Sequence, residues 1–186
     1  TIEAQIRSLV NKGPNRVAPL TIPMSISNIA SGAIAIKFGL LGSSFSITSA
    51  CASSTHCIGE AYRNIKDGYS DIIFAGGSEA SICEFGISSF QSLTALSKSE
   101  DRNRASIPFD LNRNGFVMGE GAGVLILEDL ESALKRGAKI YCEIVGYGTT
   151  SDAYHITSPC PDGNGAYRCM RDAMADAGVN CTEISY

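Results

Sequence analysis

The stretch at residues 44–77 does most to limit the folds open to this chain. It begins with the alternating, extended segment Ser44–Thr48 and continues through a corner of small residues. Apolar residues then recur at the i, i+3, i+4 and i+7 spacing of an amphipathic helix, which Gly68 ends. The apolar run DIIFAGG at 71–77 is typical of a buried strand. The pattern therefore predicts a strand, a sharp turn, a helix and a second strand in direct succession.

The rest of the chain continues this alternation. A helix capped by Asn28 is expected to end at Gly39, and the run GVLILED at 123–129 predicts another buried strand. We further expect a short helix over Leu130–Leu134 ended by Gly137, a long strand KIYCEIVGYG at 139–148, and a last helix with Ala166, Cys169, Met170, Ala173 and Ala177 facing inward before Gly178. Alternating strands and helices indicate an α/β layered fold with a largely parallel or mixed sheet. We find no linker or repeat, so residues 1–186 are predicted to form one domain or part of one.

Charge and hydropathy exclude several classes of protein. The formal net charge is −4, and no cluster of lysine and arginine marks a surface for nucleic acid. No apolar run approaches the roughly 18 residues of a membrane span, and no signal-like start is visible. We expect no membrane association and a cytoplasmic protein, or an organellar one if the source is a eukaryote. Because the chain opens like the end of a helix and stops at VNCTEISY, where another strand would follow, we also expect a fragment at both ends.

The cysteines do not suggest a metal site or a disulfide framework. Seven are present, none in a C-x-x-C motif, and the chain has only two histidines. This composition argues against zinc binding, so no metal is expected, and the odd count of thiols suggests a reducing compartment. Most of these cysteines are expected to be small core residues.

Cys51 stands out because of its position at the corner between the first strand and the helix. There its thiol would lie beside the backbone N–H groups of a helix N-terminus. The positive end of a helix favours a thiolate, and the same N–H groups can stabilise an oxyanion that forms when sulfur attacks a carbonyl carbon. Small neighbours from Ser49 to Ser54 would admit an acyl substrate. The alternative is a packed core thiol at a tight turn.

Neither histidine is an evident base for this thiol. His56 follows Cys51 by five residues, which on a helix is a rotation of about 140° and a rise of about 7.5 Å, so a structural role is favoured. His155 lies in a polar loop and could either order that loop or contact a substrate. A cysteine hydrolase or amidase that uses Cys51 with His155 stays open as a second hypothesis.

Several motifs together resemble one known family. The segments TSACASSTHCIGEA, DIIFAGGSEA and EIVGYGTTSDAYHITSP are similar to those of the β-ketoacyl-acyl carrier protein synthases, and the elongating type II branch is the nearest. The resemblance implies a thiolase-like fold, in which two similar halves contribute layered α/β sheets with helices between and outside them. It also implies a homodimer. Cys51 matches the cysteine that takes an acyl group from acyl carrier protein, after which malonyl-carrier protein loses carbon dioxide and condenses with it.

The resemblance assigns further roles by position. Phe90 would line the acyl pocket, although plain core packing explains it equally well. Asp152 and Thr157 would border the entrance for the phosphopantetheine arm that carries the substrates, with a loop cap as the alternative for Asp152. The segment Val17–Ser25 would lie at the dimer interface. No cofactor is implied. The basic residues that would contribute to docking an acidic carrier protein are Arg16, Lys98, Arg102 and Arg104.

The family pattern is also incomplete here. In the family, two catalytic histidines, a lysine and a phenylalanine gate come from a portion that would follow Tyr186, so residues 1–186 alone are not expected to catalyse condensation. A non-catalytic partner subunit is a third hypothesis, against which the presence of Cys51 argues. Near the glycine-rich stretch before 123, Asp110 and Arg113 are expected to pair.

Overall fold

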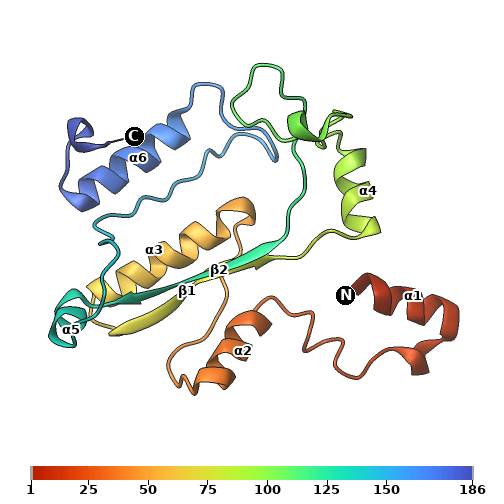
Figure 1. Cartoon of the computed structure of the whole chain (residues 1–186), viewed down its shortest axis with the longest axis horizontal. Helices are drawn as coiled ribbons and strands as arrows, with labels where there is room; N and C mark the ends of the chain where they lie inside the picture. The colour runs from red at the N-terminus through yellow and green to blue at the C-terminus, as the bar shows by residue number, and fades with distance from the viewer. Residues whose placement is uncertain (1, 186) are drawn as a thin grey trace. The chain divides into compact units, whose positions relative to one another are not determined.

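A computed structural model describes residues 2–185, which divide into two compact units. Unit 1 comprises residues 1–46 and 78–122, and unit 2 comprises residues 47–77 and 123–186. The helices of unit 1 are α1 (Ile2–Lys12), α2 (Ile29–Phe38) and α4 (Glu84–Ser92). Unit 2 holds α3 (Ser53–Lys66), α5 (Leu130–Lys135) and α6 (Asn164–Ala177), together with most of the strands β1 (Ile72–Glu79) and β2 (Gly121–Glu128) (Figure 1).

The two strands confirm the predicted runs at 71–77 and 123–129, and they pair with each other. Their arrows run in opposite directions in Figure 1. The N–H of Asp129, after the end of β2, donates to the carbonyl of Asp71, before the start of β1, at 2.9 Å. The pair is therefore antiparallel, and the parallel pairing seen within residues 2–185 is an isolated bridge between Leu96 and Phe116.

Two predicted strands do not form. Residues 44–48 and 139–148 belong to no ladder in the described part of the chain. Side chains hold the second segment instead: the Tyr62 hydroxyl donates to the Val145 carbonyl at 3.0 Å, and the Asp176 carboxylate accepts from the Tyr147 N–H at 3.0 Å. Alternation of apolar and polar residues indicates only which face of a strand would be buried. A strand also needs a neighbouring strand to pair with its backbone N–H and C=O groups.

β2 is less buried than its composition predicts. Val124, Leu125 and Ile126 are 48%, 52% and 61% exposed, whereas Ala75 of β1 is 1% exposed. Because neighbouring residues of a strand point to opposite faces, exposure at three successive positions means that neither face of β2 is covered by the described residues. The prediction of a buried strand at 123–129 was therefore wrong about burial.

The helices agree more closely with the sequence. α2 begins after Asn28 and ends at Gly39, which has φ 65°, although the Asn28 side chain makes no capping hydrogen bond. α6 ends at Gly178, with φ 68°, as expected. Of the residues predicted to face inward on α6, Cys169, Ala173 and Ala177 are half-buried, whereas Ala166 and Met170 are exposed.

The core of unit 2 lies where α3 meets the segment that precedes α6. Gly59 and Ala61 of α3 are buried, and Tyr147 is 9% exposed. A Cβ added at Gly59 would overlap three ring carbons of Tyr147, so only glycine lets this ring lie against the helix. The Arg63 guanidinium covers the ring at 4.7 Å from its centroid.

An ion pair joins α3 to α6 in the same unit. The Lys66 ammonium lies 2.7 Å from the Asp176 carboxylate and 2.8 Å from the Tyr62 hydroxyl. The hydrogen bond from Lys66, followed by the one from the Tyr147 N–H, lowers the pKa of Asp176, and the same pair raises the pKa of Lys66. These contacts hold the segment that carries Tyr147 against α3.

In unit 1, charged side chains connect α1 with α4. The Arg7 guanidinium contacts the carboxylates of both Glu3 and Glu84. The predicted pairing of Asp110 with Arg113 is wrong in its detail. The Asp110 carboxylate pairs with Arg104 at 3.0 Å, whereas Arg113 donates to the Asp110 backbone carbonyl at 3.0 Å. The N–H of Asn112, together with Arg104, lowers the pKa of Asp110.

Candidate active site

Cys51 lies in a single 3₁₀ turn, Ala50–Ala52, directly before α3. Its side chain is exposed and its thiol is free. Ala50 has φ 51°, a left-handed conformation that residues with a Cβ rarely adopt. The predicted sharp corner before a helix N-terminus is therefore confirmed, although the segment that leads into it is not a strand. Against the described residues the Cys51 side chain is not packed, and its catalytic role stays a prediction.

The N-terminus of α3 has no side-chain cap. Its N-cap residue is Ala52, which has no side-chain acceptor for the first N–H groups of the helix. Aligned peptide dipoles place partial positive charge at this end. An oxyanion that forms next to it is stabilised, so the geometry suits attack of the Cys51 sulfur on an acyl carbonyl.

Hydrogen bonds inside the turn hold its unusual backbone. The Ser53 Oγ accepts from the Ser49 N–H at 2.8 Å and donates to the Ala50 carbonyl at 2.7 Å. The Ala52 N–H donates to the Ser49 carbonyl at 3.2 Å. One serine side chain thus bonds the backbone of both Ser49 and the left-handed Ala50.

The first turn of α3 lies close against β1. A Cβ at Gly77 would overlap the Ser54 Oγ and lie 3.1 Å from the Ser54 Cβ. Any larger residue at 77 would push the helix start away from the strand. Gly77, the last residue of the AGG run at 75–77, is therefore part of what positions the Cys51 turn.

His56 is bonded at both ring nitrogens, and neither bond is to Cys51. Its Nδ1 lies 2.6 Å from the Ser49 Oγ, and its Nε2 lies 3.0 Å from the Thr149 Oγ1. The Tyr147 ring meets it edge-on, with centroids 6.4 Å apart. The favoured structural role of His56 is supported by these contacts. The involvement of Ser49 and Thr149 was not predicted, because 93 residues separate Thr149 from its partner.

His155 orders its own loop. Its Nδ1 accepts from the backbone N–H groups of Thr157 and Ser158, both at 3.1 Å. The Thr157 Oγ1 lies 3.4 Å from the same nitrogen. Among the described residues no hydrogen bond joins His155 to Cys51, so the loop-ordering alternative is the one that the contacts favour.

Asp152 links its loop to the start of α6. One carboxylate oxygen accepts from the Cys160 N–H at 2.8 Å, and the other lies against Gly165, where an added Cβ would overlap it. Nearby, the Thr150 Oγ1 donates to the Gly165 carbonyl at 2.8 Å. These contacts match the loop-cap alternative for Asp152, while a role at a pantetheine entrance stays a prediction.

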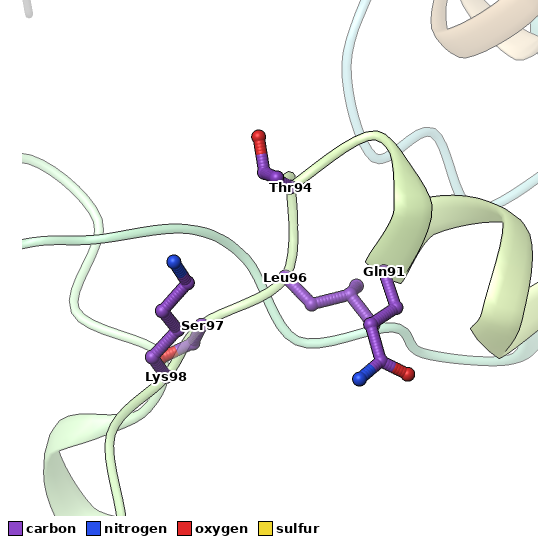
Figure 2. Close-up of a pocket in the computed structure, with 5 residues that line it drawn as sticks. All are labelled: Gln91, Thr94, Leu96, Ser97 and Lys98. Atoms are coloured by element: carbon purple, nitrogen blue, oxygen red, sulfur yellow. The ribbon is translucent and has the colours of Figure 1, made fainter.

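Phe90 belongs to α4 in unit 1 and packs edge-on against Phe116, with ring centroids 5.2 Å apart. It is 37% exposed, so it is not a fully packed core residue. Residues that follow Phe90 in the sequence line a hollow of about 350 Å³. Figure 2 shows the residues that line this hollow, which are Gln91, Thr94, Leu96, Ser97 and Lys98.

Other classes of site are not supported by the part of the chain that the structure describes. No three side chains of His, Cys, Asp or Glu gather there in a way that could hold a metal ion. None of the helices within residues 2–185 is long and apolar enough to cross a membrane. All seven cysteines are free, four of them half-buried and three exposed, so fewer lie in a core than we predicted.

Comparison with known proteins gives close relatives over the whole chain. It is 47% identical to the 3-oxoacyl-[acyl-carrier-protein] synthase 2 of Staphylococcus aureus over 186 residues, which are 46% of that protein. It is 50% identical to the synthase of the same name from Synechocystis, with 45% of that protein covered. The chain therefore spans about half the length of the curated relatives that it matches.

Solved structures show the same fold. A β-ketoacyl synthase from Burkholderia phymatum matches with a TM-score of 0.88 and 32% identity, over 99% of this chain and 45% of that one. A complex of a type II PKS acyl-carrier protein with its ketosynthase contains a chain that matches with a TM-score of 0.88 and 38% identity, over 91% of this chain and 42% of that one. The expected thiolase-like α/β fold is confirmed by these likenesses.

Matches to two protein-family models identify the family of the chain. Residues 2–133 match the family model for the N-terminal domain of β-ketoacyl synthase, and residues 141–186 match the model for its C-terminal domain. The first match alone covers well over half of the chain. The exposed cysteine at a helix N-terminus, the fold and the sequence agree: this chain belongs to the β-ketoacyl synthase family.

Proposed function

We propose that the protein extends fatty acyl chains, with Cys51 as the residue that carries the growing chain. The observation that carries this proposal is the exposed Cys51 thiol on a left-handed turn at the uncapped start of α3. The family membership and the names of the relatives, which are 3-oxoacyl-[acyl-carrier-protein] synthases, support the same activity.

The first half-reaction is a thioester exchange. The Cys51 Sγ attacks the carbonyl carbon of an acyl group held on the phosphopantetheine arm of acyl carrier protein. A new carbon–sulfur bond forms, the bond to pantetheine breaks, and the thiol proton of Cys51 ends on the pantetheine sulfur. The N–H groups at the start of α3 stabilise the oxyanion that forms in between. No further cofactor is part of the proposal.

The second half-reaction lengthens the chain. The carboxylate of malonyl-carrier protein leaves as carbon dioxide, and its bonding electrons pass to the α-carbon, which attacks the acyl carbonyl on Cys51. The carbon–sulfur bond breaks, its electrons return to the Cys51 sulfur, which takes up one proton from solvent, and a β-ketoacyl-carrier protein leaves. His56 and His155 are both held by other partners, so we assign the proton transfers of this step to neither.

Two partners belong to the proposal. A solved relative is a ketosynthase in complex with a type II PKS acyl-carrier protein, which supports acyl carrier protein as the partner that delivers substrate. The second partner is another copy of the chain. In the segment Val17–Ser25, Leu20, Ile22 and Met24 are 66%, 72% and 67% exposed, an apolar surface suited to a homodimer contact.

Product analysis tests the reaction. The full-length protein, incubated with acyl- and malonyl-carrier protein, is expected to release one carbon dioxide for each β-ketoacyl product that is two carbons longer. Release of free acid without a longer product would establish a hydrolase and contradict the proposal. No reaction at all, together with no alkylation of Cys51 by iodoacetamide, would instead support a non-catalytic partner subunit.

The homodimer has a separate test. In sedimentation, Ile22→Glu is expected to shift the full-length protein from dimer towards monomer, because a charge would be buried without a partner. Leu41→Glu is the matched control, since Leu41 is an exposed apolar residue of the same unit outside the segment. Equal effects of the two substitutions would contradict the assignment of this surface.

A further inference from the structure

Two contacts with α3 hold Ser49, the residue that precedes the 3₁₀ turn. Ser49 donates its backbone N–H to the Ser53 Oγ at 2.8 Å, while its own Oγ lies 2.6 Å from the His56 Nδ1. Ser53 and His56 belong to the first turn of α3. The first turn of the helix therefore holds Ser49 in place. The next residue, Ala50, has a φ of 51°, which is unfavourable for any residue with a Cβ.

His56 is itself fixed in orientation. Its Nε2 lies 3.0 Å from the Thr149 Oγ1, and Tyr147 meets its ring edge-on. A neutral imidazole has one donor and one acceptor nitrogen, so one of the two hydroxyls donates to the ring and the other accepts from it. The chain of contacts Thr149–His56–Ser49 thus runs from the segment before α6 to the residue two places before Cys51.

We propose that His56 is a positioning residue for the nucleophile: through Ser49 it holds the left-handed turn that presents the Cys51 thiol at the start of α3. This inference rests on the proposed function, because it assigns to Cys51 the role of nucleophile. His56 does not touch the sulfur, and its action passes through the backbone of residues 49–51. Loss of the Ser49 contact lets Ala50 relax to a right-handed or extended conformation and moves the thiol away from the helix N-terminus.

The test compares His56→Ala with His56→Asn in the full-length protein. An asparagine side chain places an amide group near the position of the imidazole Nδ1, so it can keep the hydrogen bond to Ser49 while losing the one to Thr149. The measurement is the rate of iodoacetamide alkylation of each cysteine, resolved by peptide mass spectrometry. Cys142 and Cys181, which are exposed in the same unit, are the internal references.

We expect His56→Ala to slow the alkylation of Cys51 by about tenfold, the factor that corresponds to the loss of one hydrogen bond of above-average strength. The rates at Cys142 and Cys181 should not change, and His56→Asn should restore Cys51 to within about threefold of the wild-type rate. An unchanged Cys51 rate in His56→Ala, or an asparagine variant no better than alanine, overturns the proposal.

A second variant covers the case in which His56→Ala unfolds and all cysteines react faster. Ser49→Ala removes only the hydroxyl that His56 holds, and it is expected to slow Cys51 alkylation by a similar factor; an unchanged rate overturns the proposal. Acyl transfer from acyl-carrier protein separates the two inferences. If wild type is acylated at Cys51 and the variants match it, only the positioning role fails. If wild type is not acylated but the alkylation differences hold, only the proposed function fails.

Discussion

At the contact between Gly59 and Tyr147, a Gly59→Ala substitution has two opposite effects on the free energy of unfolding: helix propensity raises it and packing lowers it. Gly59 is in the middle of α3, and Gly32 is a helical glycine of α2. Replacing glycine by alanine inside a helix stabilises it by about 1 kcal/mol when nothing obstructs the new methyl group. No atom lies within 4 Å of a Cβ at Gly32, so Gly32→Ala should gain roughly this amount.

At Gly59 the same change meets an obstacle. The new Cβ would overlap three ring carbons of Tyr147, and that ring is confined by Arg63 on its face and by its T-shaped contact with the His56 ring. Overpacking of this kind costs about 1–3 kcal/mol. After subtraction of the propensity gain, Gly59→Ala should lower the free energy of unfolding by up to roughly 2 kcal/mol.

A double-mutant cycle, followed by urea unfolding, measures how much of the cost of Gly59→Ala comes from the Tyr147 ring. In a Tyr147→Ala background the obstructing ring is gone, so Gly59→Ala should become stabilising by up to about 1 kcal/mol. The coupling free energy between the two positions should then be about 1–3 kcal/mol. If Gly59→Ala stabilises the wild-type protein as much as Gly32→Ala does, the packing of Tyr147 on α3 is refuted.

The remaining predictions concern the ion pair between α3 and α6 and the strained backbone. Because Lys66 lowers the pKa of Asp176, the folded protein binds fewer protons at this group than the unfolded chain, and the stabilisation is present above about pH 4 and lost as the pH falls through the folded pKa. Asp176→Asn should therefore be less stable than wild type in urea at pH 7 and approach it below about pH 4; an equal difference at both pH values would contradict the assignment. Thr94 has φ 56°, so Thr94→Gly should relieve about 1 kcal/mol of strain and raise the urea midpoint, whereas a lower midpoint would contradict the left-handed backbone. Lys66→Met removes the cation and should bring the pKa of Asp176, followed by NMR, back towards its ordinary range; an unmoved pKa would show that other groups cause the shift.

The sequence predicted the features that depend on local residues. Helix α3 could be anticipated because its apolar positions repeat within one element, and the ends of α2 and α6 because Gly39 and Gly178 take the left-handed conformation. The Cys51 corner was recognisable for the same reason, since small residues between an extended segment and a helical pattern permit only a tight turn.

The features that depend on distant partners could not be predicted. The segment 139–148 has the composition of a strand, yet its backbone is held by Tyr62 and Asp176 instead of a neighbouring strand. The partner of Asp110 is Arg104, although Arg113 is nearer in sequence. The contact between His56 and Thr149 spans 93 residues, and no local pattern marks it.

Intact-mass analysis tests most directly whether Cys51 is the residue that carries the acyl chain. The full-length protein is incubated with acyl-carrier protein, and its mass and peptide map are compared with those of Cys51→Ala. We predict one added acyl group on the peptide that contains residue 51, sensitive to hydroxylamine as a thioester is, and none in the variant. An unmodified protein, or an acyl group on any other cysteine, would contradict the account.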